Sequence, residues 1–450
     1  GDEYKMSMTL KIPPTYLPAL ITLRRQGLDF NSELDGIMAA QLQDVTQSKM
    51  SLNTDQIAAL EKIKKWLSGN EPYFALRGFS GTGKSTLMAE VAKLDYNFYF
   101  SAPTNKATKV LSDFLNLPTK TTYSLLGLRM VAEEDTRVLT ANALPNLGTN
   151  PILVIDEAGM LQRNLVDLLV SAGYRCLLVG DPAQLNPIGE IMSRAWALAG
   201  KNRVLLSKVE RYDNQLLALS IALRNNLKAK KWVSPIKDDN DGVQGVFVKT
   251  RKNFEAYIMS LRLEDWDTVK LCCWRNRTVE GYNNMIREAL GFVEDYEVGE
   301  RLLLASPYSV SGTIVAYTDE ELVLKGIDKR RFTFADYELE AYVFDVGRDF
   351  VLHVPVDASA FEARKSKLAS RASQLKGAAR KAAWDEFWKF SDTFSQVRYG
   401  YAMTCHRVQG TTLDHVLVDQ SDILANPNKP EAFRALYVAA TRARYTMTTF

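Results

Sequence analysis

Eight residues early in the chain, Gly78 to Ser85, have the spacing of a phosphate-binding loop. They read GFSGTGKS and match the pattern G-x-x-x-x-G-K-[ST]. In such a loop, backbone N–H groups at a helix N-terminus bind phosphate oxygens, the lysine reaches the β- and γ-phosphates, and the hydroxyl that follows ligates Mg²⁺. We therefore expect a site for ATP and Mg²⁺. The residues expected to bind the nucleotide are Gly78, Gly81, Thr82, Gly83, Lys84, Ser85 and Thr86.

Two adjacent carboxylates, Asp156 and Glu157, follow the apolar run PILVI. At the carboxyl end of a parallel strand, such side chains face the phosphate-binding crevice. We expect Asp156 to hold Mg²⁺ together with Ser85, and Glu157 to activate the attacking water. The next apolar run ends in GDPAQ, which places Gln184 to sense the γ-phosphate or the polarised water. Without a phosphate-binding loop, the two carboxylates would indicate only a surface turn.

The flanking segments explain how these residues could meet. The apolar run Tyr73–Leu76 predicts a strand, and Ser85–Ala92 has helical spacing, so the loop lies where a strand passes into a helix. Leu52–Ile57 opens an amphipathic helix with Thr or Asn as its N-cap. Apolar strands then alternate with helices along the chain, which predicts an α/β fold with parallel sheets.

Composition excludes several classes of protein. At 450 residues and 46% hydrophobic content, the chain can bury at least two cores. No apolar run approaches the roughly 18 residues that span a bilayer, so we expect a soluble protein. The four cysteines lack C-x-x-C spacing, which favours reduced thiols in an intracellular compartment over disulfides or a zinc site. The net charge of +3 is too small to indicate a nucleic-acid partner by itself.

Five motifs together resemble those of a known family. GFSGTGKS, VIDEAGM, GDPAQLNPI, TCHRVQG and YVAATRAR occur in the order of superfamily-one helicase motifs, and the resemblance is strongest to the RecD/Dda-like, 5′-to-3′ branch. The segments WDEFW and TFSQV ahead of TCHRVQG extend it. The resemblance covers about residues 52–450. It implies two RecA-like P-loop domains, each a parallel sheet flanked by helices, with ATP bound between them.

The resemblance also assigns nucleotide contacts outside the phosphate-binding loop. Gln56 matches the family glutamine that reads the adenine edge, and Gly410 lies in a motif that borders the nucleotide. Arg211 and Arg442 match arginines of the second domain that reach the γ-phosphate. The catalytic set expected by this resemblance is Lys84, Asp156, Glu157, Gln184, Arg211 and Arg442. Outside the family context, Gln56 would be a solvated helix residue and each arginine a surface or salt-bridge residue.

Single-strand contacts are implied by resemblance at both domains. SAPTNK and TTYSLL look like strand-binding motifs of the first domain, with Tyr123 where relatives usually have histidine. TCHRVQG supplies contacts from the second domain, although His406 could instead be a core histidine. Arg275 replaces the usual threonine-like residue in the segment that resembles the fourth motif. The residues expected to contact DNA are Pro103, Thr104, Asn105, Thr121, Tyr123, Asn276, Thr404 and His406.

The predicted organisation has five parts. Residues 1–50 form an N-terminal extension, 51–200 the first motor domain, 201–300 the first part of the second motor domain, 301–395 an insert, and 396–450 the rest of the second domain. Residues 128–150 lie where relatives carry a β-hairpin pin. The insert is expected to contain a small SH3-like β-barrel and a basic helix over 363–389. That basic run is either a solvated face or a surface that steers nucleic acid.

These observations predict a monomeric, ATP- and Mg²⁺-dependent helicase. The resemblance alone implies that it acts on DNA, including DNA forks, and that it moves 5′ to 3′ on single strands. An RNA helicase of the Upf type shares the motif order, and a nucleotide-gated strand clamp or recombination mediator is a third hypothesis. We expect location in the bacterial cytoplasm or in a phage-infected host cell. Residues 1–50 either dock a single-strand-binding or replication protein or pack on the motor.

Overall fold

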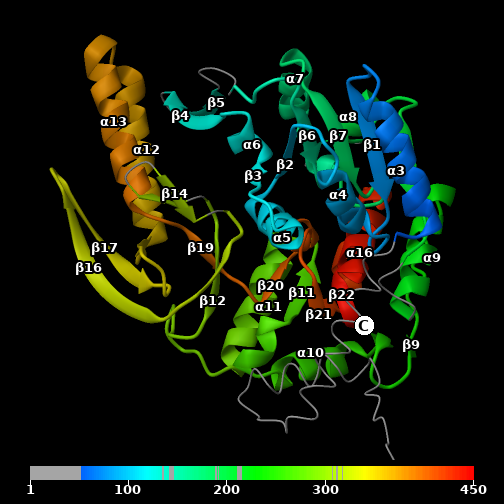
Figure 1. Cartoon of the computed structure of the whole chain (residues 1–450). Coiled ribbons are helices and arrows are strands. Elements are labelled where there is room, and N and C mark those ends of the chain that lie inside the picture. Colours follow the sequence, from blue (N-terminus) through cyan, green and yellow to red (C-terminus); the bar gives the residue numbers. More distant parts are fainter. Residues whose placement is uncertain are drawn as a thin grey trace, which may run out of the picture.

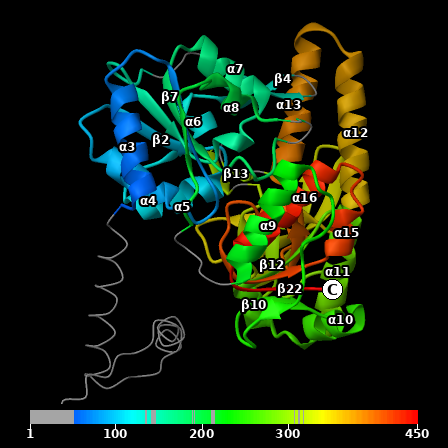
Figure 2. The same ribbon diagram turned by 90° about the vertical axis from the view of Figure 1, so that its right-hand side faces the viewer.

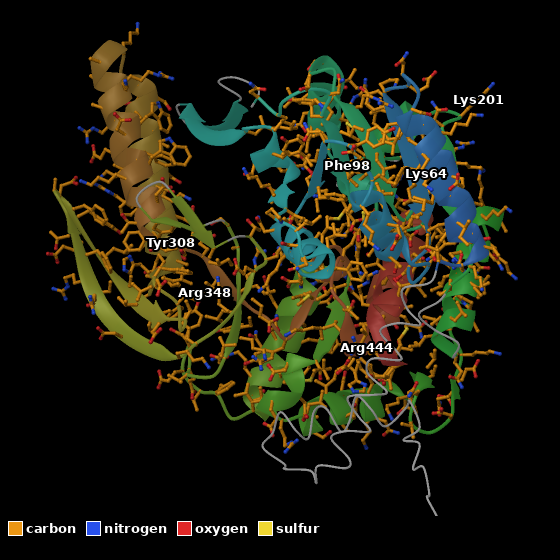
Figure 3. All side chains as sticks on the ribbon, in the orientation of Figure 1. Lys64, Phe98, Lys201, Tyr308, Arg348 and Arg444 are labelled. Atoms are coloured by element: carbon orange, nitrogen blue, oxygen red, sulfur yellow. The ribbon has the colours of Figure 1, made fainter. Side chains whose placement is uncertain are left out.

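The computed structural model describes residues 52–133, 136–140, 146–187, 190, 192–209, 215–306, 308–310, 313–316 and 318–450. The predicted extension over residues 1–50 therefore lies outside the described residues. Figure 1 shows three regions, which are an upper sheet with its helices, a lower sheet with its helices, and an insert at one side. In Figure 3, Lys64, Phe98 and Lys201 lie in the first region, Arg444 in the second, and Tyr308 and Arg348 in the insert.

The first sheet has six parallel strands. Their order is β3 (Lys120–Thr121), β2 (Phe98–Ala102), β6 (Ile152–Ile155), β7 (Arg175–Gly180), β1 (Tyr73–Gly78) and β8 (Arg203–Leu206). The accompanying helices are α3 (Thr54–Leu67), α4 (Lys84–Ala92), α5 (Asn105–Leu115), α6 (Thr122–Leu125), α7 (Arg163–Ser171) and α8 (Arg194–Leu198), with a 3-10 turn over Ala158–Met160.

Both faces of this sheet are buried. Ile152 and Val154 of β6 pack with residues of α3, α4 and α5, whereas Leu153 and Ile155 pack with residues of α7 and α8. Successive strand residues point to opposite faces, so a strand covered on both sides must be apolar throughout. This requirement explains why β6 reads ILVI.

The second sheet has the order β20 (Ala402–Thr404), β11 (Val269–Cys273), β21 (Leu413–Val418), β22 (Ala443–Thr449), β10 (Gly245–Val248) and β9 (Asp239–Asn240). All neighbours are parallel except β9 and β10. Its helices are α9 (Gln215–Ala229), α10 (Arg251–Ser260), α11 (Asn276–Ala289), α14 (Cys405–Val408), α15 (Gln420–Leu424) and α16 (Lys429–Arg442), with a 3-10 helix over Leu263–Asp267. The predicted fold class, two RecA-like α/β domains, is confirmed.

Two of the predicted domain boundaries are wrong by one strand. Strand β8 pairs with β1, so the first domain continues past residue 200. Strand β19 (Val397–Tyr399) pairs with β12 (Arg301–Leu304), so the insert continues past residue 395. Both strands are short, and their pairing partners lie far away in sequence. Local composition therefore could not assign them to a sheet.

The described strands of the insert form three small antiparallel sheets. One has the order β15 (Glu321–Val323), β12 and β19, a second pairs β13 (Tyr308–Val310) with β14 (Thr313–Ala316), and a third contains β16 (Gly326–Phe334), β17 (Tyr337–Asp345) and β18 (Val351–Pro355). Leu302, Tyr308, Leu322, Phe344 and Leu352 bring these sheets into one core. A closed SH3-like barrel remains a prediction.

The basic segment of the insert is not a single helix. It folds as two antiparallel helices, α12 (Ala358–Gln374) and α13 (Gly377–Thr393), which pack along their length. Gly377 has a φ of 59°, a left-handed conformation that glycine adopts without strain and that allows the chain to reverse. Phe361 and Leu368 of α12 pack with Trp384 and Phe387 of α13, so these side chains form the core between the two helices.

The region expected to contain a pin includes a β-hairpin. Strands β4 (Arg129–Glu133) and β5 (Thr136–Thr140) pair antiparallel, with residue 129 opposite residue 140. In Figures 1 and 2 this hairpin lies beside α13 of the insert. Its correspondence to the pin of relatives remains a prediction.

The cysteines agree with the expectation of reduced thiols. All four fall within the described ranges, where they are buried and form no disulfide. Burial raises the pKa of Cys176 to about 12, which keeps this thiol protonated at neutral pH. Among the described residues, no helix is both long enough and apolar enough to cross a bilayer.

Candidate nucleotide and strand sites

The phosphate-binding loop joins β1 to α4. Gly81 and Gly83 have φ values of 79° and 76°, so left-handed backbone turns the chain twice before α4 begins at Lys84. A Cβ atom on Gly78 would lie 2.6 Å from the Thr82 hydroxyl, and one on Gly83 would lie 2.1 Å from Gln56 Nε2. Gly81 and Gly83 are therefore required by the left-handed backbone, and Gly78 and Gly83 by the lack of space for a side chain. No side chain caps the N-terminus of α4, which leaves its N–H groups for an anion.

Lys84 bends back over this loop. Its Nζ donates to the carbonyl oxygens of Gly78 at 2.8 Å and Phe79 at 3.1 Å. The Thr82 hydroxyl donates to the same Phe79 oxygen at 2.8 Å. The ammonium group therefore lies above the loop backbone, where phosphate oxygens can replace the carbonyls as its acceptors. Ser85 and Thr86 are half-buried in the first turn of α4.

Gln56 connects helix α3 to the phosphate-binding loop. Its side chain is buried, and its Nε2 donates to the carbonyl oxygens of Thr82 at 3.2 Å and Gly83 at 3.4 Å. Its Oε1 accepts the N–H of Asn53 at 2.9 Å and completes a capping box at the start of α3. The solvated alternative is therefore wrong. Contact with an adenine edge remains a prediction.

The paired carboxylates stand at the carboxyl end of β6. Asp156 Oδ1 accepts the N–H of Glu157 at 2.9 Å. Glu157 has a φ of 49°, a left-handed conformation that is strained for a residue with a side chain and is frequent at active sites. Burial raises the pKa of Asp156, and the positive charge of Lys84 partly opposes that rise. The charge of Lys84 on the phosphate-binding loop therefore acts on the Asp156 carboxyl group.

Glu157 has the pKa of a group suited to proton transfer near neutral pH. Burial raises the pKa of Glu157 to about 7, the negative charge of Asp156 contributes further, and the charges of Lys84 and Arg442 oppose the rise. Lys84 and Asp156 belong to the first domain, whereas Arg442 ends helix α16 of the second. Charges from both domains therefore act on the same carboxyl group. This is the arrangement that a hydrolytic site between two domains requires.

Arg442 is buried at the end of α16. Its Nη1 donates to the carbonyl oxygen of Thr411 at 3.1 Å and its Nη2 to the Thr441 hydroxyl at 3.4 Å, while its Nε has no hydrogen-bond partner among the described residues. Gly410, beside Thr411, has a φ of 80° and lets the chain turn at this point. The guanidinium group thus retains donor capacity for an anion. Arg211, the other expected arginine, lies outside the described residues.

Gln184 forms a contact between the domains. Its Oε1 accepts Nε2 of Gln409 at 2.8 Å, and both side chains are buried. Gln184 follows β7 of the first domain, and Gln409 follows α14 of the second. A residue predicted to sense the γ-phosphate is therefore bonded directly to a motif of the other domain.

Tyr437 is a residue that the sequence did not single out. Its side chain is fully buried on α16. Its hydroxyl donates to Asp181 Oδ2 at 2.7 Å, and the hydroxyl oxygen of Tyr437 accepts the N–H of Ser80 at 3.2 Å. Ser80 lies in the phosphate-binding loop and Asp181 follows β7. One hydroxyl of the second domain thus joins two nucleotide motifs of the first. In the sequence, only the position of Tyr437 at the start of the motif YVAATRAR indicates that it could lie near the nucleotide site.

Two arginines of the second domain reinforce this contact. Arg434 Nη1 donates to the carbonyl oxygens of Pro182 and Gln184, each at 2.7 Å. The guanidinium carbon of Arg224 on α9 lies 3.9 Å from the centre of the Phe79 ring, a cation–π geometry. Helices α9 and α16 therefore contact the phosphate-binding loop and the loop after β7.

We expect Tyr437→Phe to lower the free energy of unfolding by about 1–3 kcal/mol, because the buried Asp181 carboxylate and Ser80 N–H each lose a partner. Chemical denaturation without nucleotide measures this change. Tyr445→Phe is the matched control, since the Tyr445 hydroxyl forms no hydrogen bond with the described residues. Equal stability of the two variants would contradict the assigned contact.

The residues expected to contact DNA follow the outer strands of both sheets. Pro103, Thr104 and Asn105 come after β2, and Thr121 and Tyr123 stand at the end of β3 and in α6. In the second sheet, Thr404 ends β20 and Asn276 follows β11, while His406 lies in α14. Strands β3 and β2 form one end of the first sheet, and β20 and β11 one end of the second. The nucleotide motifs of the first domain follow β6, β7 and β1, on the other side of β2 from β3, so topology separates the two sites.

The side chains of this set are only partly available for a ligand. Thr104 and Thr121 use their hydroxyls as N-caps, accepting the N–H of Ala107 at 3.2 Å and of Ser124 at 3.1 Å. Tyr123 packs on the core, and burial raises its pKa. Thr104 and Asn276 are exposed. DNA contact by these residues remains a prediction.

His406 lies between a carboxylate and an aromatic ring. Its Nε2 is 3.7 Å from Glu431 Oε1, and its ring centre is 5.7 Å from that of Trp274. Burial lowers the pKa of His406, which favours a neutral imidazole at neutral pH. The ring is therefore held against the second domain, with Trp274 beside it.

Comparisons with known proteins give a consistent result. Residues 51–241 match a family model described as an AAA domain, and residues 399–446 match the UvrD-like helicase C-terminal domain. The chain is similar to an uncharacterized protein of Acanthamoeba polyphaga mimivirus, with 24% identity over 87% of this chain and 98% of that protein. It is equally similar to the ATP-dependent DNA helicase dda of Enterobacteria phage T4, with 24% identity over 88% of this chain and 98% of that protein.

Solved structures of Pif1 helicases also align along most of the chain. A structure of two coordinating Pif1 helicases at forked double-stranded DNA covers 88% of this chain and 92% of its own, with a TM-score of 0.49 and 15% identity. A Bacteroides Pif1 helicase in complex with ADP-AlF3 and single-stranded DNA covers 87% of this chain and 91% of its own, with a TM-score of 0.46 and 16% identity.

Proposed function

We propose that this chain, which belongs to the Dda-like helicases of superfamily one, is an ATP-dependent DNA helicase that moves 5′ to 3′ on a single strand. The observation that carries the proposal is the direct contact of the second RecA-like domain with nucleotide motifs of the first. The Tyr437 hydroxyl bonds to Asp181 and to the N–H of Ser80, and Gln409 bonds to Gln184. A nucleotide bound there would contact both domains, so its hydrolysis would change their relative position.

Each residue of the proposed site has a separate role. Lys84 neutralises charge on the β- and γ-phosphates, and the N–H groups at the start of α4 hold the phosphate oxygens. Glu157 accepts a proton from the attacking water. Arg442 stabilises the charge that develops on the γ-phosphate, because a guanidinium stays ionised and binds phosphate oxygens in two places. Gln184 links the γ-phosphate region to Gln409 of the second domain.

The donor set fits Mg²⁺. Ser85 and Asp156 offer a hydroxyl and a carboxylate oxygen, and Mg²⁺ sites of this kind combine one or two carboxylates with substrate phosphates and water. No cluster of three or more histidine, cysteine, aspartate or glutamate side chains forms a separate metal site within the described ranges. When bound, the ion would neutralise phosphate charge.

The strand site would run across both domains. Thr104 and Asn105 on the first domain and Thr404, His406 and Asn276 on the second follow the outer strands of their sheets. Hydroxyls, amides and backbone N–H groups suit contacts to phosphate and sugar that do not depend on base sequence. Opening and closing of the domains would then move one group of contacts relative to the other.

The direction of movement is tested by unwinding of two DNA duplexes that differ only in having a 5′ or a 3′ single-stranded tail. We expect ATP-dependent unwinding from the 5′ tail alone. A preference for the 3′ tail would contradict the proposed direction. ATPase activity stimulated by single strands without unwinding would indicate a translocase or strand clamp, and stronger stimulation by poly-U than by poly-dT would indicate an RNA substrate.

A further inference from the structure

The helical hairpin of the insert carries an unusual charge distribution. Residues 363–384 contain seven lysines and arginines and no aspartate or glutamate. The whole chain has a net charge of only +3, so the remainder of the molecule is net negative. The segment covers most of α12, the turn to α13 and the first part of α13. Positive charge is therefore concentrated on one structural element.

One face of α12 is already used for folding. Phe361, Leu368 and Ala372 are buried against Trp384 and Phe387 of α13. Arg364 belongs to this side as well, because its guanidinium is buried and pairs with Asp336 and covers the ring of Tyr337. These contacts fix the orientation of the helix and determine which residues face outward.

Beyond Glu362 and Ala363, which are also exposed, the outward face of α12 is polar and basic. Its exposed residues recur at helical spacing. They are Ser366, Lys367, Ser370, Arg371, Ser373 and Gln374. Arg371 pairs with Glu386 at 3.4 Å and the Ser373 hydroxyl donates to the carbonyl oxygen of Ala369, so the charged groups of this surface without such a partner in the described part of the chain are Lys367 and, around the turn, Lys376 and Lys381. Lys376 and Lys381 continue this surface around the turn and are exposed, with no ion pair to the described carboxylates. Lysine, arginine and serine side chains are the groups that proteins use to contact the nucleic-acid backbone.

The surface lacks the features of a single-strand site. Proteins that hold single strands without sequence preference stack bases on aromatic side chains. The only aromatic residue in the segment 363–384 is Trp384, and it is buried. The exposed groups can therefore contact phosphates but cannot stack on unpaired bases. A duplex offers phosphates and keeps its bases stacked inside.

The helical hairpin also lies beside the β-hairpin found where relatives carry a pin. Helices α12 and α13 project away from the second RecA-like domain in Figures 1 and 2, and the β4–β5 hairpin lies beside α13 in both views. A duplex that ends near β4 and β5 would therefore have the basic hairpin within reach.

We propose that the exposed face of α12 and the start of α13, defined by Ser366, Lys367, Ser370, Arg371, Lys376 and Lys381, binds the phosphate backbone of duplex DNA ahead of the point of strand separation. This inference rests on the proposed helicase function. The contact is electrostatic and independent of sequence, and it lies outside the two RecA-like domains. It would hold the duplex in place while the motor domains move on the single strand.

The test compares two triple variants of the full chain. Lys367→Glu, Lys376→Glu and Lys381→Glu together reverse charge on the proposed surface, and Lys62→Glu, Lys228→Glu and Lys252→Glu make the same change of net charge at exposed lysines of α3, α9 and α10. Binding is measured for a blunt DNA duplex and for a short single strand, each over a range of salt concentrations. ATPase activity stimulated by the single strand is measured in parallel.

We expect the variant with Lys367, Lys376 and Lys381 replaced, the hairpin variant, to bind duplex about tenfold or more weakly at low salt. The slope of its log affinity for duplex against log salt concentration should fall by about one for each lysine removed from phosphate contact. Its affinity for the single strand and its stimulated ATPase activity should stay within about twofold of the unmodified protein, as expected for a surface outside the motor. The control variant should retain duplex affinity.

Three outcomes would overturn the inference. These are unchanged duplex affinity in the hairpin variant, an equal loss in the control variant, and an equal loss for the single strand. Failure of the proposed function is a separate result, because it would appear as an absence of strand-stimulated ATPase activity in the unmodified protein. Circular dichroism of both variants shows whether the helices remain folded.

Discussion

Replacing Lys84 with alanine is expected to lower the rate of ATP hydrolysis by about a thousandfold or more, because Lys84 is the one basic residue in the loop sequence GFSGTGKS. The Nζ atom now donates to the carbonyls of Gly78 and Phe79, so the loop loses two hydrogen bonds but keeps its glycine conformation. Single-strand binding without ATP should be nearly unchanged, since the expected strand contacts follow other strands. Steady-state phosphate release and fluorescence anisotropy measure the two properties.

The control for this prediction is Lys93→Ala. Lys93 follows α4 and pairs with Glu90 on the surface, so it shares the helix but not the site. It should hydrolyse ATP at a nearly normal rate. Near-normal turnover in the Lys84 variant would refute the assigned site, and loss of strand binding in that variant would show that the loop also shapes the strand site.

The second large effect is expected at Arg442. Arg442→Ala should lower the hydrolysis rate by about 10³ to 10⁵, the range typical of an arginine that stabilises charge on the transferred phosphate. Nucleotide affinity should change much less, because the phosphate-binding loop belongs to the other domain. The buried Nε without a described partner indicates that the guanidinium has a donor to offer. Single-turnover hydrolysis separates the chemical step from binding.

Arg444→Ala is the matched control. Arg444, labelled in Figure 3, lies two residues further along the same motif, but it is exposed and pairs with Asp414 at 3.3 Å. It should retain most of the activity. Because Arg442 also supports the Thr411 carbonyl, Arg442→Lys and a thermal denaturation curve distinguish loss of chemistry from loss of folding. A folded Arg442→Ala variant with normal turnover would contradict the role proposed for this residue.

The contacts between the domains suggest how the two sites communicate. Tyr437 and Arg434 on α16 bind loops of the first domain that also carry nucleotide motifs. Gln409, in the motif TCHRVQG that is expected to contact the strand, binds Gln184 of the first domain. The motifs expected to bind the nucleotide and the strand are therefore joined by direct hydrogen bonds. A change at the γ-phosphate would reach the expected strand site through these hydrogen bonds.

Several errors in the sequence-based organisation share one cause. Strand β8 belongs to the first domain and β19 to the insert, and the basic segment forms two helices, whereas the sequence predicts that both strands belong to the second motor domain and that the segment is a single helix. Pairing of a short strand depends on a partner distant in sequence, as in β19 with β12, and composition does not report such pairing. The reversal at Gly377 depends on its left-handed conformation and on packing between the two helices.

The sequence by itself determined the α/β fold class, the phosphate-binding loop, the paired carboxylates and the order of the helicase motifs. It could do so because these features are local, since a glycine at a left-handed turn or an apolar strand ending in carboxylates is visible within a few residues. Only the tertiary structure decided that Gln56 holds the loop, that Tyr437 joins Ser80 to Asp181, and that the basic segment is a projecting hairpin with one outward face. These are contacts between residues as far as 357 positions apart. They depend on how the two domains and the insert pack, which the chemistry of any one segment leaves open.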